Sequence, residues 1–244
     1  MFRSLVFAFA ALLLLGSNTF AAEKILVASN PTWPPMEFLD GQKNIIGYDA
    51  DFIKAVAKEA GLEVEMRETA WDGIFAGLAG GSYQLVASAV TITEERKKAY
   101  EFTKPYYEVQ QVVVSRKGTH FPDFASLKGK LLGGQIGTTG IFVAEKAKSG
   151  ATIREYDDAG LAMQDLTNGR IDAVICDSPV ALYYANKKEG FSDKLQVSFR
   201  TTGDEFYGFV AQKGNTKLIE RLNKGIDAVR AKGIEKELMK KWLE

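Results

Sequence analysis

One stretch of the chain collects groups that can bind a small anion. Residues 89–98 read Ala-Val-Thr-Ile-Thr-Glu-Glu-Arg-Lys-Lys and directly follow the apolar run 85–87. They offer the hydroxyl of Thr91, the backbone amides of a helix start and the guanidinium of Arg96. A guanidinium binds a carboxylate through two parallel hydrogen bonds, and helix starts attract anions. Paired with Asp177, much later in the chain, this stretch predicts a cleft that holds an α-amino acid by both of its charges.

The placement of Arg96 favours a nearby anion. Thr93 can cap a short helix that begins with Glu94 and Glu95, so Arg96 falls in the first turn. A cation there interacts unfavourably with the helix dipole, unless an anion lies close to it. The alternative is a surface arginine paired with a neighbouring glutamate, and only the surrounding threonines favour the anion site over it.

Asp177 has two competing interpretations. It follows a strand of apolar residues and Cys176, and it precedes Ser178-Pro179, which predicts a helix start. Asp177 either caps that helix or accepts hydrogen bonds from a ligand ammonium group. One carboxylate can do both only in part, so the two interpretations remain open.

Other strand ends carry further candidates. Residues 134–139 read Gly-Gln-Ile-Gly-Thr-Thr and form a strand-to-helix turn of the kind that attracts anions. Trp33 stands in a stiff, proline-rich loop, and Trp71 follows another predicted strand. Each indole alone is by default a core residue, but beside a cleft both would enclose the aliphatic part of a ligand.

The elements that must position these groups are short β-branched runs alternating with helical patterns, which is typical of α/β architecture. We expect strands at 25–28, 64–66, 85–87, 111–115, 130–133, 153–156, 173–175 and 206–211. We expect helices that start at Asp49, Asp72, Thr138 or Thr139, Asp158 and Ser178, and amphipathic helix over most of 216–243.

A weak internal sequence similarity, the internal echo, indicates two similar halves. Residues 78–88 align with residues 166–176 at a constant offset, and each segment leaves a helix at a glycine and enters a buried strand. A chance match between two generic turns is an equally good explanation. If the echo is real, 88–89 and 176–177 are matching strand ends on opposite walls of one cleft, where ligands of open α/β sheets bind.

Compartment and composition exclude several classes of protein. A basic start, an apolar core at 5–15 and small residues before 22 predict a secretory signal peptide at 1–22, cleaved after Ala21 or Ala22. No cysteine sits at this junction for lipidation, so we expect a soluble periplasmic protein.

The 31 basic and 31 acidic residues cancel, which disfavours nucleic acid as a partner. One cysteine and one histidine allow neither an internal disulfide nor a structural zinc site, and we expect no metal and no cofactor.

Several motifs occur in a specific order that covers the mature chain. They are Trp33-Pro-Pro-Met-Glu-Phe38, Gly47-Tyr-Asp-Ala-Asp51, Trp71-Asp72, Thr91-Ile-Thr-Glu-Glu-Arg96, Phe102-Thr-Lys-Pro-Tyr106, Gly137-Thr-Thr139 and Ile171-Asp-Ala-Val174. Together they resemble the polar amino-acid-binding proteins of bacterial ABC transporters, the family 3 solute-binding proteins. The resemblance implies a type II periplasmic-binding-protein fold, with two α/β lobes joined by two hinge strands and closing over one ligand. Lobe 1 would comprise residues 23–107 plus 206–244, and lobe 2 residues 108–205.

The resemblance also assigns roles to the site residues. Arg96 would bind the ligand α-carboxylate with Thr91 and the amide of Thr139. Asp177 would pair with the α-amino group, together with Thr91 and the carbonyl of Ala89. The other expected ligand-binding residues are the aromatic walls Trp33 and Trp71, the turn residue Thr138, and Asn30, Ser88 and Gln135, which fall where relatives set side-chain specificity. Cys176 also falls at such a position, and the sequence does not say whether it contacts the ligand.

One departure from the family pattern bears on the ligand. Many relatives that bind lysine, arginine, histidine or glutamine carry aspartate at the position of Asn30, and no other expected side-chain-pocket residue here is acidic. A cationic side chain would be desolvated without a countercharge, which is costly. We therefore expect a neutral polar ligand such as glutamine, delivered by a monomeric protein to the permease subunits of an ABC transporter.

Two other classes of function remain as alternatives. A branch that resembles this family contains dehydratases of cyclic carboxylic acids, which need a general acid in the cleft. The only carboxylate we can place there is Asp177, so we expect no enzyme activity, and incubation with arogenate or prephenate distinguishes the two. A receptor sensor module would need a membrane segment after the lobes, and we expect none up to Glu244.

Overall fold

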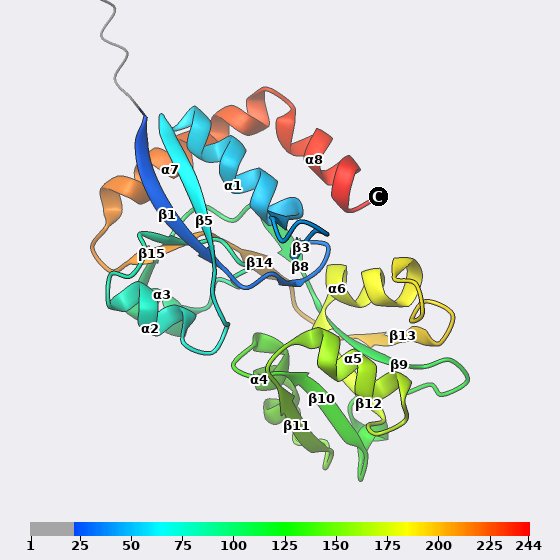
Figure 1. The fold of residues 1–244 in the computed structure, drawn as a ribbon. Helices are drawn as coiled ribbons and strands as arrows, with labels where there is room; N and C mark the ends of the chain where they lie inside the picture. Colours follow the sequence, from blue (N-terminus) through cyan, green and yellow to red (C-terminus); the bar gives the residue numbers. More distant parts are fainter. Residues whose placement is uncertain (1–21) are drawn as a thin grey trace, which may run out of the picture.

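The structure, a computed structural model, describes residues 22–244, so the expected signal peptide lies outside the described residues except for Ala22. Two five-stranded sheets lie in separate halves of the molecule (Figure 1). The first sheet has the order β5 (Leu62–Glu68), β1 (Glu23–Ser29), β6 (Leu85–Val86), β15 (Val210–Gln212) and β7 (Tyr100–Phe102). The second has the order β11 (Thr152–Tyr156), β10 (Leu131–Gln135), β12 (Ala173–Asp177), β9 (Gln111–Arg116) and β13 (Leu195–Arg200).

Helices cover both sheets, as parallel strands require. The first half carries α1 (Tyr48–Glu59), α2 (Ile74–Ala79), α3 (Glu94–Ala99), α7 (Thr216–Ala231) and α8 (Ile234–Trp242). The second half carries α4 (Thr139–Ala147), α5 (Ala159–Thr167) and α6 (Ser178–Leu182), with a 3₁₀ turn at Ala125–Leu127 and a π-helical turn at Tyr183–Lys187. Within residues 22–244, no helix has the length and apolarity to cross a bilayer.

Two smaller sheets complete the fold. One is made of β2 (Thr32–Trp33), β3 (Glu37–Leu39) and β4 (Ile45–Ile46). The other pairs β8 (Tyr107–Val109) with β14 (Glu205–Tyr207) in antiparallel register. Strand β8 leads into β9 of the second sheet, and β14 leads back to β15 of the first, so the chain passes between the halves along this pair (Figure 1). This path supports our division into residues 23–107 plus 206–244 and residues 108–205, which stays a proposal.

The central strands of each sheet are parallel, so their carboxyl ends gather at one edge. Strand β1 pairs in parallel with β5 and β6, and β10 pairs in parallel with β11 and β12. Strands β6 and β12 are buried throughout, as the apolar runs predict. Strands β6 and β12 follow the aligned glycines Gly81 and Gly169, both at positive φ, as expected both for two similar halves and for two generic turns. The residues that follow these strands are those with candidate chemistry.

A glycine explains three of the boundaries that differ from the sequence-based expectation. Helix α2 begins at Ile74 after the left-handed Gly73, so Asp72 is not its cap. The expected strand 206–211 divides into β14 and β15 around Gly208, where a Cβ would lie 2.9 Å from the Ile92 side chain. The expected helix 216–243 breaks at Gly233, with φ of 75°.

Close packing of α7 on α1 depends on Gly225. A Cβ at this position would lie 2.3 Å from the backbone oxygen of Val56. We expect Gly225→Ala to lower the free energy of unfolding by about 1–3 kcal/mol, because backbone atoms cannot yield as a flexible side chain can. Urea denaturation measures this effect, and Gly41→Ala is the control, since no atom lies within 4 Å of its Cβ. An unchanged urea midpoint for Gly225→Ala would contradict the packing.

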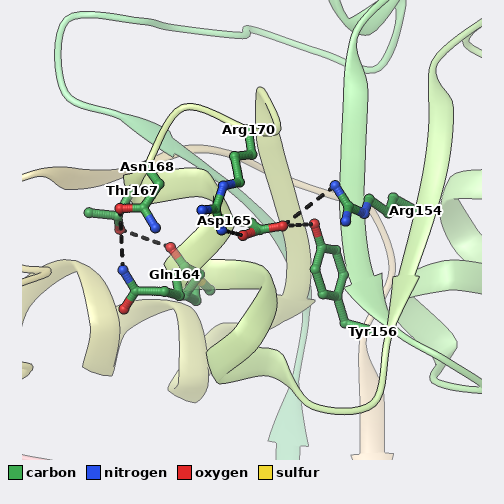
Figure 2. Close-up of polar contacts among 8 residues, drawn as sticks. Arg154, Tyr156, Gln164, Asp165, Thr167, Asn168 and Arg170 are labelled. Carbon is green, nitrogen blue, oxygen red and sulfur yellow. Dashed lines mark hydrogen bonds and ion pairs between the residues drawn. The ribbon is translucent and has the colours of Figure 1, made fainter.

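A polar cluster around Asp165 ties α5 to the neighbouring strand β11 (Figure 2). The Tyr156 hydroxyl donates to Asp165 at 3.0 Å, Arg170 donates at 2.9 Å, and Arg154 forms an ion pair at 3.5 Å. The hydrogen bond from Arg170 contributes most to lowering the pKa of Asp165 below its ordinary value. Both arginines are exposed, so the ion pairs stabilise lobe 2 only modestly.

Candidate ligand-binding site

A cavity lies between the two halves of the molecule. Residues from both sheets line it, and they include every ligand-binding candidate expected from the sequence. The lining residues are Asn30, Trp33, Glu37, Trp71, Ser88, Ala89, Thr91, Arg96, Gln135, Thr138, Thr139 and Asp177. Glu37 is the one lining residue that the sequence analysis did not place there.

Parallel strands explain why these distant residues meet. Asn30 follows β1 and Ser88 follows β6, while Gln135 ends β10 and Asp177 ends β12. Each therefore lies at the carboxyl end of a central strand. Ala89 has a φ of 45°, a left-handed conformation that costs energy for a residue with a Cβ. Asp49 holds this turn by accepting a hydrogen bond from the Ala89 amide at 2.9 Å.

Arg96 reaches across the cavity from α3. The Thr93 hydroxyl accepts from the Arg96 amide at 3.1 Å, so the expected helix cap is present. The guanidinium donates to the Thr91 carbonyl at 3.0 Å and to the Gly137 carbonyl of the other half at 3.2 Å. It also lies over the Trp71 ring, 5.6 Å from the centroid. Burial lowers the pKa of Arg96 to about 10, which leaves the group protonated at neutral pH.

The alternative interpretation of Arg96, a surface arginine paired with a glutamate, is wrong. The two glutamates of α3 pair with the lysines instead, Glu94 with Lys97 and Glu95 with Lys98, each at 2.8 Å. These four side chains stay at least half exposed. The carbonyl oxygens that accept from Arg96 are neutral, so among the described residues its charge has no directly bonded counterion.

Asp177 does not cap α6. Its side chain makes no capping hydrogen bond and instead accepts from Gln111 at 2.6 Å and from the Tyr207 hydroxyl. Asp177 is 4% exposed. Burial is the main reason why its pKa rises to about 6, while the bond from Tyr207 opposes the rise. A buried carboxylate held only by neutral donors at a cavity wall favours a cationic group beside it.

A polar network joins the two halves near Asp177. The hydroxyls of Thr91 and Thr139 lie 3.3 Å apart across the cavity. Glu205 on β14 accepts from Thr139 at 2.8 Å and from Gln111 at 2.9 Å. Neither Gln111 nor Glu205 was expected at the site from the sequence. A polar residue at the start of the otherwise apolar strand 111–114 was a usable signal for Gln111, whereas Glu205 carried none.

The other end of the cavity carries a second polar group. The Asn30 side-chain oxygen accepts from Gln135 at 3.1 Å and from Thr32 at 2.8 Å. The Ser88 hydroxyl accepts from the backbone amide of Asn30 at 2.9 Å and donates to the Glu37 carboxyl group at 3.1 Å. Our expectation that this pocket holds no acidic residue is therefore wrong. The sequence does not predict the burial of Glu37, because its hydrogen-bond partner Ser88 lies 51 positions away in the chain.

The remaining candidates lie in the cavity wall, in the turn before α4 and in the apolar core. Trp33 is buried at the cavity wall, and Trp71 packs edge-on against Phe75 with ring centroids 5.4 Å apart. Thr138 occupies the N-cap position of α4, but its hydroxyl donates to the Gln135 carbonyl rather than capping the helix. Cys176 is buried in the apolar core and does not line the cavity, so it fills space.

Comparisons with known proteins agree with this fold and cavity. Residues 25–244 match the model of the bacterial extracellular solute-binding proteins, family 3. A probable histidine-binding protein of Neisseria gonorrhoeae is 34% identical over 85% of this chain and 78% of its own length. ABC transporter arginine-binding protein 1 of Escherichia coli strain K12 is 34% identical over 94% of this chain and 96% of its own length.

Solved structures give the same result. An ancestral arginine-binding protein bound to glutamine superposes with a TM-score of 0.84 at 34% identity, over 90% of this chain and 97% of that one. The architecture is thus the two-lobed type II fold of periplasmic binding proteins. The chain belongs to the bacterial extracellular solute-binding proteins of family 3.

Proposed function

We propose that this protein captures an α-amino acid between its two lobes in the periplasm and delivers it to the permease of an ABC transporter. One observation carries the proposal: Arg96 and Asp177 lie at one cavity, and they come from opposite halves of the chain. A zwitterion carries the two complementary charges on one carbon. Its carboxylate would bind Arg96, its ammonium group would bind Asp177, and the hydroxyls of Thr91 and Thr139 would assist.

Ligand capture would stabilise the closed arrangement. Several polar contacts already cross between the proposed lobes, among them Arg96 to Gly137, Thr91 to Thr139, and Gln135 to Asn30. A ligand that binds both walls adds free energy to the closed form only, so it shifts the population toward that form. Micromolar affinity requires about 8 kcal/mol, much of which two charge-assisted contacts in a closed cleft can supply. The permease would then recognise the closed monomer.

The polar end of the cavity supports a neutral ligand side chain, with glutamine as the first candidate. The oxygen of Asn30 is already engaged by Gln135 and Thr32, so its amide nitrogen is the group left to face a ligand. A nitrogen donor recognises a carbonyl oxygen and not the donors of a guanidinium or ammonium group. The named relatives are a probable histidine-binding protein and an arginine-binding protein, so cationic amino acids are the comparison that matters.

The test is a thermal-shift screen against the twenty amino acids, ornithine, citrulline and cystine, followed by calorimetry. We expect glutamine or another neutral polar amino acid to give the largest rise in melting temperature, because bound ligand stabilises the folded state. Tighter binding of arginine or lysine than of every neutral amino acid would contradict the neutral-ligand proposal. No binding of any amino acid would contradict the function itself.

We propose binding rather than catalysis, although Glu37 adds a second carboxyl group to the cavity. A dehydratase needs an acid free to protonate a leaving hydroxyl. Asp177 is engaged by Gln111 and Tyr207, and Glu37 is engaged by Ser88 through one oxygen. The paired charges of Arg96 and Asp177 are sufficient for holding a zwitterion, and binding requires no further group.

A further inference from the structure

Glu205 lies behind the cavity wall and bonds to residues that form it. It is the first residue of β14, and its Oε2 atom accepts from the Thr139 hydroxyl at 2.8 Å, from the Gln111 side-chain amide at 2.9 Å and from the Thr91 hydroxyl at 3.5 Å. Thr91 and Thr139 line the cavity, whereas Glu205 does not. Glu205 can therefore act on a ligand only through the side chains that it holds and through its charge.

The polar hydrogens behind this wall are fewer than their acceptors. Gln111 has two amide protons, and its nitrogen lies 2.6 Å from Asp177, 2.9 Å from Glu205 and 3.0 Å from Thr139. The two carboxylates are the stronger acceptors and take both protons. The single hydroxyl proton of Thr139 goes to Glu205 for the same reason. At most one lone pair of the Thr139 oxygen accepts from Thr91, at 3.3 Å, so another is left for a ligand donor.

The same contacts place two carboxylates side by side. The Gln111 amide nitrogen bridges Asp177 and Glu205. Within residues 22–244, no lysine or arginine forms an ion pair with either carboxylate. Two neighbouring anions without a bonded cation favour a cationic group beside them. Asp177 offers a direct contact to such a group, and Glu205 adds negative charge from behind the wall.

We propose that Glu205 is a positioning residue for the α-ammonium group of the ligand: its carboxylate takes the hydroxyl proton of Thr139, so the Thr139 oxygen faces the ligand as an acceptor beside Asp177. Without Glu205, the Thr139 hydroxyl is free to turn its proton toward the cavity, where a donor repels an ammonium group. This inference rests on the proposed amino-acid binding function and deepens it, because it assigns a role in that site to a residue outside the cavity.

Calorimetry at pH 7 with L-glutamine and L-arginine tests this role, because the two ligands share the α-ammonium group and differ in the side chain. If either does not bind the wild-type protein, the next tightest-binding amino acid of the screen replaces it. We expect Glu205→Ala to weaken both ligands about tenfold, because the ammonium group loses one oriented acceptor. Glu205→Gln keeps an acceptor for the Thr139 hydroxyl and should recover part of the loss. Glu108→Ala, exposed on the paired strand β8, is the matched control and should bind as the wild type does.

A double-mutant cycle shows whether Glu205 acts through Thr139. Thr139→Val removes the hydroxyl and nearly preserves the shape of the side chain. In that background, Glu205→Ala should weaken binding less than about threefold, because no hydroxyl is left to orient. A glutamate that only stabilised the fold would lower the melting temperature and give equal losses of affinity in both backgrounds.

The pH profile separates the charge of Glu205 from a purely structural role. Titratable groups of several elements act on Asp177, namely Glu37 of β3, Arg96 of α3, Cys176 of β12, and Glu205 and Tyr207 of β14. Burial, and in addition the nearby charge of Glu205, raises the pKa of Asp177 to about 6. Glu205→Gln removes this charge, so the pKa of Asp177 should fall and binding should persist to lower pH than in the wild-type protein. Calorimetry from pH 7 to pH 4.5 measures the shift.

The failures of this inference and of the proposed function are distinguishable. Wild-type affinity in Glu205→Ala, equal losses with and without the Thr139 hydroxyl, or an acid limit of binding that Glu205→Gln does not lower would each overturn the role of Glu205. Amino-acid binding would stand in all three cases. A wild-type protein that binds no amino acid of the screen would overturn both proposals.

Discussion

Replacing Arg96 with alanine should reduce amino-acid affinity about a hundredfold to a thousandfold, equivalent to about 3–4 kcal/mol. The guanidinium is the cation at the cavity, and removing it leaves a buried ligand carboxylate without its partner. Loss of one member of a buried, hydrogen-bonded charge pair costs about 2–5 kcal/mol. The fold should survive, because within residues 22–244 the guanidinium donates hydrogen bonds only to the carbonyls of Thr91 and Gly137.

Isothermal titration calorimetry at pH 7 measures the effect of Arg96→Ala. Lys97→Ala is the matched control, because Lys97 lies on the same helix and pairs with Glu94 away from the cavity. Arg96→Lys should recover only part of the affinity, since an ammonium group cannot make the paired hydrogen bonds of a guanidinium. Wild-type affinity in Arg96→Ala would remove the basis for placing the α-carboxylate at α3.

Replacing Asp177 with asparagine should weaken binding about tenfold to a hundredfold, because the ligand ammonium loses its anionic partner. The substitution preserves the shape of the side chain, so the change reports mainly on charge. The bonds from Gln111 and Tyr207 cross to β9 and β14, and some loss of thermal stability is expected as well. Asp193→Asn, on the exposed surface of lobe 2, is the control.

The pH dependence gives an independent readout for Asp177. Its pKa is about 6 in the ligand-free protein, and a bound ammonium group favours the ionised form. Binding should therefore release a proton near this pH, and wild-type affinity should fall as the pH drops below about 6, by up to about tenfold per pH unit. Asp177→Asn should show no such fall. A wild-type affinity that is constant from pH 7 to pH 4.5 would show that Asp177 does not meet the ligand cation.

Local sequence signals located Asp177 because it ends a strand, and Arg96 because it lies in the first turn of a capped helix. Thr93 and Asp158 cap the helices expected of them, and the apolar run before Asp177 forms the strand β12. Parallel strands then bring their carboxyl ends together without further information. The ordered motifs added the two-lobed arrangement, which periodicity alone does not supply.

The side-chain end of the cavity could not be predicted in the same way. Glu37 is buried where it accepts a hydrogen bond from Ser88. Gln135 of the other half sets the orientation of the Asn30 side-chain amide. Glu205 reaches Thr139 from a strand between the lobes. These contacts join residues far apart in the sequence, so neither burial nor donor direction is visible in the local pattern.

The most direct test of the account is a crystal structure with the tightest-binding amino acid of the screen. We expect the ligand α-carboxylate within hydrogen-bond distance of the Arg96 guanidinium and the α-ammonium group within that distance of the Asp177 carboxylate, with the lobes closed. A ligand bound outside this cavity, or one in the cavity whose α-carboxylate and ammonium contact neither residue, would contradict the account.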